Sequence, residues 1–289
     1  MTDSPRARSL ISRSFVPFSL ASAIAAVVLA LSASPCAAAA PSAESFHAVT
    51  CDGAYPGHLQ GVCTNDADAI YWSFTTVLVK TDANGRVLAK VDVASHHGDL
   101  CFHDGKLFVA VNLGQFNLPA GKADSWVYVY DSATLKELAR HKVPELVHGA
   151  GGVAFRAGRF FVVGGLPVGA KENSVYEYDP SFTFQKRHLL DSGYTLMGIQ
   201  TIAFADDHWW FGCYGVTRVV LKADNSFKLV GKWNLDCSLG IVGLPDGKLL
   251  VARGERGKDK QYTGRLAVAV PDDEQGLRLL DEPQKNPTK

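Results

Sequence analysis

Residues 103–109, His-Asp-Gly-Lys-Leu-Phe-Val, join a tight turn to a short apolar strand. An Asp-Gly pair favours a tight turn, and the β-branched and aromatic residues after it favour extended structure. The same pattern occurs four more times, with strands at 69–72, 159–162, 208–211 and 248–251. A second kind of turn alternates with the first, and its copies lie 45–49 residues apart, at Asp82, Asp131, Asp179, Asp224 and Pro271.

This spacing matches the length of a four-stranded propeller blade. Each unit consists of an inner strand, a turn, an apolar second strand, a loop, a third strand, a turn and an outer strand. Near-continuous apolar second strands are typical of the middle of a blade, which is buried on both faces between its neighbours. Five units fill residues 58–282, so we predict an all-β chain forming a single β-propeller of five four-stranded blades. A β-sandwich is the alternative, but it would not need a fivefold register.

The sequence leaves open how the propeller ring closes. One candidate is Glu44–Thr50, which would pair with the last blade. The other is Arg278–Asp281, which would supply the outer strand of that blade alone.

The N-terminal part of the chain has a different character. Three arginines within residues 6–13 precede an apolar stretch over 18–31, and four alanines follow at 37–40. This is the three-part pattern of a secretory signal peptide. We predict a signal peptide over 1–40, a lead-in segment over 41–57, the propeller over 58–282 and a tail over 283–289. The protein is then secreted or periplasmic, without membrane attachment once the signal peptide is removed.

The charge balance excludes two classes of partner. The chain has 29 basic and 29 acidic residues, so it offers no electrostatic case for binding nucleic acid or an anionic membrane surface. We expect a monomer whose partner is a small polar molecule.

Five cysteines remain after the predicted signal peptide, and an oxidising compartment makes them disulfide candidates. Cys51 and Cys63 flank a short loop and are the first choice of pair. Cys213 and Cys237 are the second choice, because the repeat places both near one face on neighbouring blades. Cys101 is then left as a buried thiol.

The five inner strands of such a propeller begin at the same end of the central channel, and the loops between second and third strands open there too. Residues far apart in sequence become neighbours at this face, which makes it the expected binding site. The strand starts contribute His58, Gln60, His97, Asp99, His148 and Gln200. The loops contribute Ser73, Asn112, Tyr214 and Arg253.

Three interpretations of this face remain open. In the first, the neutral imidazoles of His58, His97 and His148 hold a divalent metal, zinc or calcium. In the second, the face hydrogen-bonds a small polar ligand such as a sugar or a peptide end. In the third, its polar groups only satisfy backbone atoms and channel waters. Catalysis is a further alternative, with His97 as a base and Asp99 as the carboxylate that orients it.

The first blade, with His58-Leu59-Gln60-Gly61-Val62, Ile70-Tyr71-Trp72-Ser73 and the turn at Asp82, resembles the opening blade of the secreted glutaminyl cyclotransferases of plant and bacterial type. The resemblance covers about one blade and implies a five-bladed propeller. The corresponding alternative function is a cyclotransferase-, lyase- or hydrolase-like enzyme. The chain departs from that family's pattern, because it has His97-Gly98-Asp99 in place of a Glu-Gly pair and no Asn-Glu-Leu-Glu segment.

Overall fold

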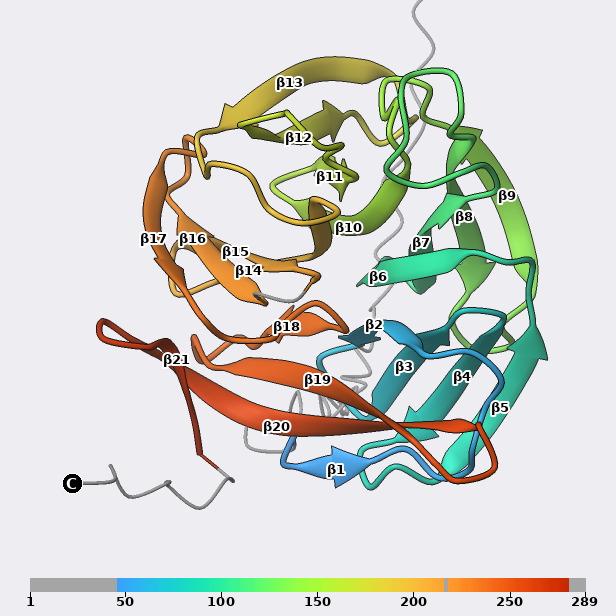
Figure 1. Ribbon diagram of the computed structural model, residues 1–289. Coiled ribbons are helices and arrows are strands. Elements are labelled where there is room, and N and C mark those ends of the chain that lie inside the picture. Colours follow the sequence, from blue (N-terminus) through green and yellow to red (C-terminus); the bar gives the residue numbers. More distant parts are fainter. Residues whose placement is uncertain (1–45, 216–217, 281–289) are drawn as a thin grey trace, which may run out of the picture. The chain divides into compact units, whose positions relative to one another are not determined.

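The computed structural model describes residues 46–215 and 218–280. Figure 1 shows these residues as five antiparallel sheets arranged in a ring, each sheet forming one blade. The described residues contain strands and turns but no helix, and accordingly none of them forms a helix that is long and apolar enough to cross a membrane. The prediction of an all-β, five-bladed propeller is confirmed.

The first four blades are each built from four strands that follow one another in sequence and in space. Blade 1 contains β2 (Leu59–Thr64), β3 (Ala69–Phe74), β4 (Val77–Asp82) and β5 (Val87–Asp92). Blade 2 contains β6 (His97–His103), β7 (Lys106–Asn112), β8 (Ser125–Asp131) and β9 (Glu137–Lys142). Blade 3 contains β10 (Ala150–Arg156), β11 (Arg159–Gly164), β12 (Asn173–Tyr178) and β13 (Phe184–Leu190). Blade 4 contains β14 (Ile199–Ala205), β15 (His208–Cys213), β16 (Val219–Ala223) and β17 (Leu229–Trp233).

Blade 5 closes the ring by using both candidate segments. Its first three strands are β18 (Ile241–Gly243), β19 (Leu249–Arg256) and β20 (Tyr262–Asp272). The outer edge of β20 pairs with β21 (Gly276–Leu279) along its C-terminal half and with β1 (Val49–Thr50) along its N-terminal half. The lead-in segment therefore supplies part of the last blade.

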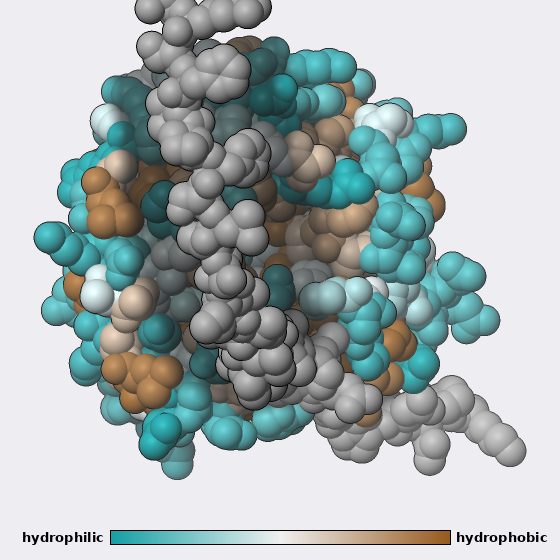
Figure 2. Space-filling view, turned by 180° about the vertical axis from the view of Figure 1, so that it is seen from behind, coloured by the Kyte–Doolittle hydropathy of each residue, from teal (hydrophilic) through white to brown (hydrophobic). Residues whose placement is uncertain are grey.

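The blades are held together by hydrophobic packing between neighbours. Strand β3 is buried along its whole length, whereas the outer strand β5 alternates between half-buried and exposed positions. Phe108 of blade 2 and Phe160 of blade 3 belong to one core cluster, with ring centroids 4.4 Å apart. On the face seen in Figure 2, hydrophobic side chains form small groups separated by hydrophilic ones. The core therefore lies between the blades, where apolar area is removed from water.

Both predicted disulfides are wrong, because all five cysteines of the described residues are free thiols, including Cys101, which was expected to be one. Neither the Cys51–Cys63 pair nor the Cys213–Cys237 pair is formed. Cys51 packs in the core between blades 1 and 5, where its Sγ lies 3.8 Å from the Tyr55 hydroxyl oxygen. Strand β2 carries Cys63 into a different cluster, between blades 1 and 2. Closeness in sequence does not bring the two sulfurs together, because the two residues serve different blade interfaces.

Candidate functional site

The inner strands of blades 1 to 4 share an irregularity near their first residues. Pairing with the second strand skips between Leu59 and Gly61, His97 and Leu100, Ala150 and Gly152, and Ile199 and Thr201. Such a skip is a β-bulge, which leaves residues unpaired and redirects their side chains. The bulged residues are Gln60 in blade 1, Gly98 and Asp99 in blade 2, Gly151 in blade 3 and Gln200 in blade 4.

These bulges decide which side chains reach the channel. The residues directly before them are all buried: Leu59, His97, Ala150 and Ile199. The bulged residues other than Asp99 line one cavity of about 370 Å³, which we name the channel pocket. Its full lining is His58, Gln60, His96, Gly98, Asn112, Gly114, Phe116, Ala150, Gly151, Met197, Gln200 and Tyr214.

The channel pocket is uncharged. Among the described residues, no Asp, Glu, Lys or Arg belongs to its lining. Burial lowers the pKa of both pocket histidines, His58 and His96, below the usual 6.5, so both rings are neutral at neutral pH. Amides and imidazoles supply the hydrogen-bonding groups, while the rings of Phe116 and Tyr214 supply apolar surface. This combination is typical of sites that bind small polar molecules.

The Gln60 side chain connects the two pocket histidines. Its amide nitrogen Nε2 lies 2.8 Å from Nε2 of His58 and 2.6 Å from Nε2 of His96. Because the amide nitrogen donates, each ring accepts at Nε2 and carries its proton on Nδ1. The described residues provide no partner for Oε1 of Gln60. This oxygen is thus available as an acceptor, and the two Nδ1–H groups as donors.

Two more amides have different roles in the pocket. Gln200 donates from Nε2 to the Met197 carbonyl oxygen at 2.8 Å, and within the described part of the chain its Oε1 has no partner. Asn112 uses both ends of its amide on the protein, donating to Gly114 O at 3.1 Å and accepting from the Asp124 N–H at 2.9 Å. Gln200 is therefore a ligand-binding candidate, whereas Asn112 fixes the loop that carries Phe116.

Asp99 is fully buried and joins the inner strands of three blades. Its carboxylate accepts the N–H of Val62 in blade 1 at 3.3 Å and the N–H of Ile202 in blade 4 at 3.2 Å. Burial raises the pKa of this carboxyl, and these N–H donors, with that of Leu100, counteract the rise. A Cβ on Gly61 would lie 2.3 Å from the Cα of Asp99, so glycine is required there. Asp99 is thus a cross-link between blades and does not line the pocket.

His97 also lies outside the pocket. It has no exposed surface, and its Nε2 lies 2.8 Å from the Tyr130 hydroxyl while Nδ1 lies 2.6 Å from the Ala94 carbonyl oxygen. Burial lowers the pKa of His97 to about 4. The structure therefore does not bring His97 and Asp99 together as a base and its orienting group. Its position before the bulge directs the ring of His97 into blade 2 and leaves the channel to His96.

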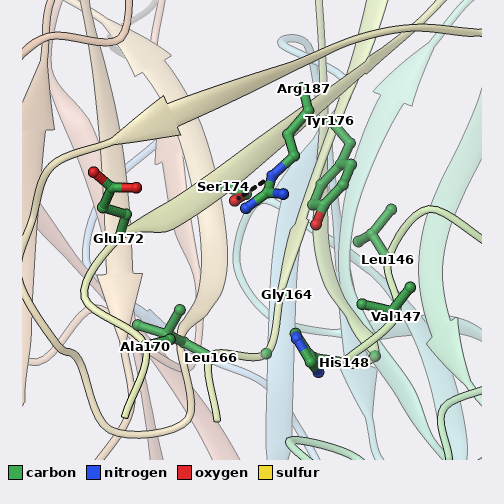
Figure 3. A pocket seen from close by; sticks show the side chains of 12 residues that line it. Leu146, Val147, His148, Gly164, Leu166, Ala170, Glu172, Ser174, Tyr176 and Arg187 are labelled. Carbon is green, nitrogen blue, oxygen red and sulfur yellow. Dashed lines mark hydrogen bonds between the residues drawn. The ribbon is translucent and has the colours of Figure 1, made fainter. Parts of the chain in front are cut away.

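His148 belongs to a second, smaller cavity of about 110 Å³. Its Nδ1 lies 2.8 Å from the Leu118 carbonyl oxygen. Figure 3 shows His148, Leu166 and Ala170 on one side of this cavity and Arg187 with Ser174 on the other. Nε of Arg187 donates to the Ser174 hydroxyl at 3.0 Å. Unlike the channel pocket, this cavity has charged side chains in its wall.

The predicted three-histidine metal site is not formed. His58 lines the channel pocket, His97 is enclosed in blade 2 and His148 lines the second cavity. Across residues 46–215 and 218–280, no three His, Cys, Asp or Glu side chains come together in a way that could hold a metal ion. In the described part of the chain, His58, His97 and His148 therefore do not form the predicted ligand set for zinc or calcium.

Of the loop residues, Asn112 and Tyr214 reach the channel pocket, whereas Ser73 and Arg253 do not. Ser73 is buried in β3, and Arg253 is half-buried in β19. Of the larger side chains in the pocket lining, the predicted site left out three: His96, Phe116 and Met197. The His96-His97 pair was a visible signal, but choosing between its two members required the register of β6. Nothing in the local sequence marks Phe116 or Met197.

The comparisons with known proteins address the fold. No family model matches this chain, and no curated protein matches it. The glutaminyl cyclase of Myxococcus xanthus is similar in structure, with a TM-score of 0.53 and 12% identity over 78% of this chain and 99% of that one. A protein of unknown function from Bacteroides caccae has a TM-score of 0.45 and 15% identity over 73% of this chain and 77% of that one. At 12% identity, the likeness to the cyclase concerns the fold alone.

The fold and the site together define the class of protein. The chain is a five-bladed β-propeller similar in fold to a glutaminyl cyclase, with an uncharged pocket at one end of its central channel.

Proposed function

We propose that this propeller binds a small, neutral, polar ligand in the channel pocket. The observation that supports the proposal is the composition of the pocket wall: neutral amides and imidazoles beside two aromatic rings, with no charged side chain. A cavity of about 370 Å³ has room for a small molecule such as a monosaccharide or a short amide.

The absence of charged lining residues favours a neutral ligand over an ionic one. A carboxylate or an ammonium group moved from water into a cavity without a counter-charge loses more hydration energy than it regains. A sugar needs only donors and acceptors, and the pocket offers both. Of the two ligand types suggested by the sequence, a sugar-like molecule therefore fits better than a charged peptide end.

Individual residues have distinct roles in this proposal. Oε1 of Gln60 and Oε1 of Gln200 accept hydrogen bonds from ligand hydroxyl or amide groups. The Nδ1–H groups of His58 and His96 donate. Tyr214 is about one-third exposed at the pocket, where its ring is available to stack against an apolar face of the ligand.

The test is ligand-observed NMR and calorimetry with a panel of neutral and charged homologues, for example glucose, glucuronate and glucosamine beside acetamide and acetate. We expect a neutral member to bind and its charged homologue to bind more weakly. Gln60→Leu and Gln200→Leu should each weaken binding about tenfold, the effect of about 1.4 kcal/mol for a lost hydrogen bond. His148→Ala, outside the channel pocket, is the matched control and should bind normally.

Two results would contradict the proposal. One is tighter binding of the charged homologues, and the other is full binding by the Gln60→Leu, Gln200→Leu double variant. Circular dichroism of each variant verifies that the blades remain folded.

We further propose that the protein acts outside the cytoplasm, as a secreted or periplasmic protein. The support is the signal-peptide pattern in residues 1–40, which lie outside the described residues. Mass spectrometry of the protein recovered from the periplasm or medium tests this, because cleavage near Ala40 gives a chain that begins close to Pro41. Recovery of the uncleaved chain from the cytoplasm would contradict it.

A further inference from the structure

Exposed hydrophobic side chains gather around the mouth of the channel pocket. Seven of the thirteen exposed large hydrophobic residues among those described lie on loops at this end of the blades. These loops precede an inner strand or join a second strand to a third, in blades 2, 3 and 4. We name the seven residues the apolar crescent: Leu113, Leu118, Val147, Val168, Tyr194, Leu196 and Tyr214.

Around the mouth of the pocket, each loop that carries part of the apolar crescent contacts the next one. In blade 2, the N–H of Asn117 donates to the His148 carbonyl oxygen at 2.8 Å, so the loop with Leu118 touches the one with Val147. A Cβ on Gly165 would lie 2.4 Å from the His148 carbonyl oxygen, and a Cβ on Gly198 would lie 2.7 Å from the Gly165 carbonyl carbon. The loop with Val168 therefore contacts both the loop with Val147 and the loop with Leu196. A Cβ on Gly215 would lie 2.6 Å from the Leu196 side chain, which places Leu196 beside Tyr214. The loops that carry the crescent are therefore contiguous.

The apolar crescent is also continuous with the channel pocket. Tyr214 belongs to both. The pocket residues Phe116 and Met197 stand in the same loops as Leu118 and Leu196. The lining of the second cavity includes Leu146 and Leu166 as well as the charged Glu172 and Arg187 (Figure 3). The loops of blades 2 to 4 therefore place exposed hydrophobic side chains next to the channel pocket.

The mouth is not apolar all round. In blade 1 the corresponding loop contains Thr75 and Thr76, and in blade 5 it is 257–261, Gly-Lys-Asp-Lys-Gln. Hydrophobic exposure that merely followed from loop position would occur in every blade. Exposed apolar surface collected on one side of a pocket instead marks a binding surface.

We infer that the ligand of the channel pocket is amphiphilic: a neutral polar head group with an apolar substituent that lies on the apolar crescent. This inference rests on the proposed function and extends it from the head group to the whole ligand. Each methylene that is fully buried raises the affinity about fourfold. A chain of six carbons lying on an open surface buries part of that area, which corresponds to an affinity gain of about tenfold or more.

Matched pairs of ligands test the inference: methyl and hexyl β-D-glucopyranoside, and N-methylacetamide with N-hexylacetamide, each measured by calorimetry below its aggregation concentration. We expect the hexyl member of the binding pair to bind at least about tenfold tighter than the methyl member. In a triple variant with Leu118→Ser, Val168→Ser and Leu196→Ser, the hexyl member should bind no tighter than the methyl member. The methyl member should bind as in the unchanged protein.

A double variant on outer strands, Leu138→Ser with Val230→Ser, is the control, since both residues are exposed but distant from the mouth loops in their blades. This control variant should bind the hexyl member as much more tightly than the methyl member as the unchanged protein does. Equal affinity for the two members of a pair overturns the inference while leaving the proposed function intact. A gain that persists in the triple variant also overturns it and assigns the crescent to another partner. If no member of any pair binds, the proposed function fails and the inference with it.

Discussion

Replacing His97 and Tyr130 together, by Leu and Phe, should remove an acid-dependent loss of stability from this protein. His97 is fully buried, and its Nε2 lies 2.8 Å from the Tyr130 hydroxyl. The corresponding positions in blades 1 and 4 are Leu59 and Ile199. Removing both hydrogen-bond partners at once leaves no unsatisfied group between them, and the carbonyl oxygen that loses His97 Nδ1 belongs to the exposed Ala94. At pH 8 we therefore expect the double variant to lie within about 1 kcal/mol of the unchanged protein.

The magnitude follows from the pKa of His97, which burial lowers from 6.5 to about 4. Between these two values the unfolded chain binds a proton at His97 that the folded protein does not. The contribution of His97 to stability is therefore complete above pH 6.5 and is lost as the pH falls toward 4. A difference of about 2.5 pKa units corresponds to about 3 kcal/mol.

The assay is urea unfolding followed by tryptophan fluorescence at pH values from 8 to 4. The free energy of unfolding of the unchanged protein should fall by about 3 kcal/mol more than that of the double variant over this range. Burial also lowers the pKa of His58, His96 and His141, but these act in both proteins and cancel in the difference. Parallel stability curves for the two proteins would refute the reasoning.

Two further predictions concern the interior. Asp99→Ala should lower the free energy of unfolding by about 2–4 kcal/mol, because the buried N–H groups of Val62 and Ile202 lose their acceptor. Urea unfolding measures this change. A loss below about 0.5 kcal/mol would contradict the cross-linking role of Asp99. The five thiols of the described residues should all be alkylated in denaturant without a reductant, since none is in a disulfide. Mass spectrometry counts the adducts, and two fewer adducts before reduction than after it would reveal a disulfide. In the folded protein the reaction should be slow, because burial raises the thiol pKa, for Cys213 to about 12.

The repeat shows which features of the fold can be predicted from local sequence. Alternating turn signals and apolar strands predicted five blades, because strand formation and turn chemistry depend on residues close together in the chain. The same register correctly placed Gln60 and Gln200 at the end of the channel where the pocket lies. For ring closure the sequence offered Glu44–Thr50 and Arg278–Asp281 as alternatives, whereas in the structure β20 is long enough to pair with both β1 and β21.

The exact membership of the pocket depended on the tertiary structure. A bulge changes the direction of a side chain by shifting the pairing by one residue, and nothing in His96-His97-Gly98-Asp99 reveals where that shift falls. His97 therefore became a core residue and Asp99 a cross-link between blades, while His96 took the place in the pocket. His148 was assigned to a different cavity for a similar reason, because the neighbouring loop of blade 2 holds its ring.

The sequence by itself determined that this protein is a five-bladed β-propeller with polar groups at one end of its channel, because periodicity and turns are local properties. The tertiary structure alone decided which of those groups share the channel pocket and that an apolar crescent borders it. Both depend on contacts between blades: Asp99 reaches Ile202, 103 residues away, and Leu196 packs beside Gly215 on another loop. Such contacts are fixed only when the ring has closed.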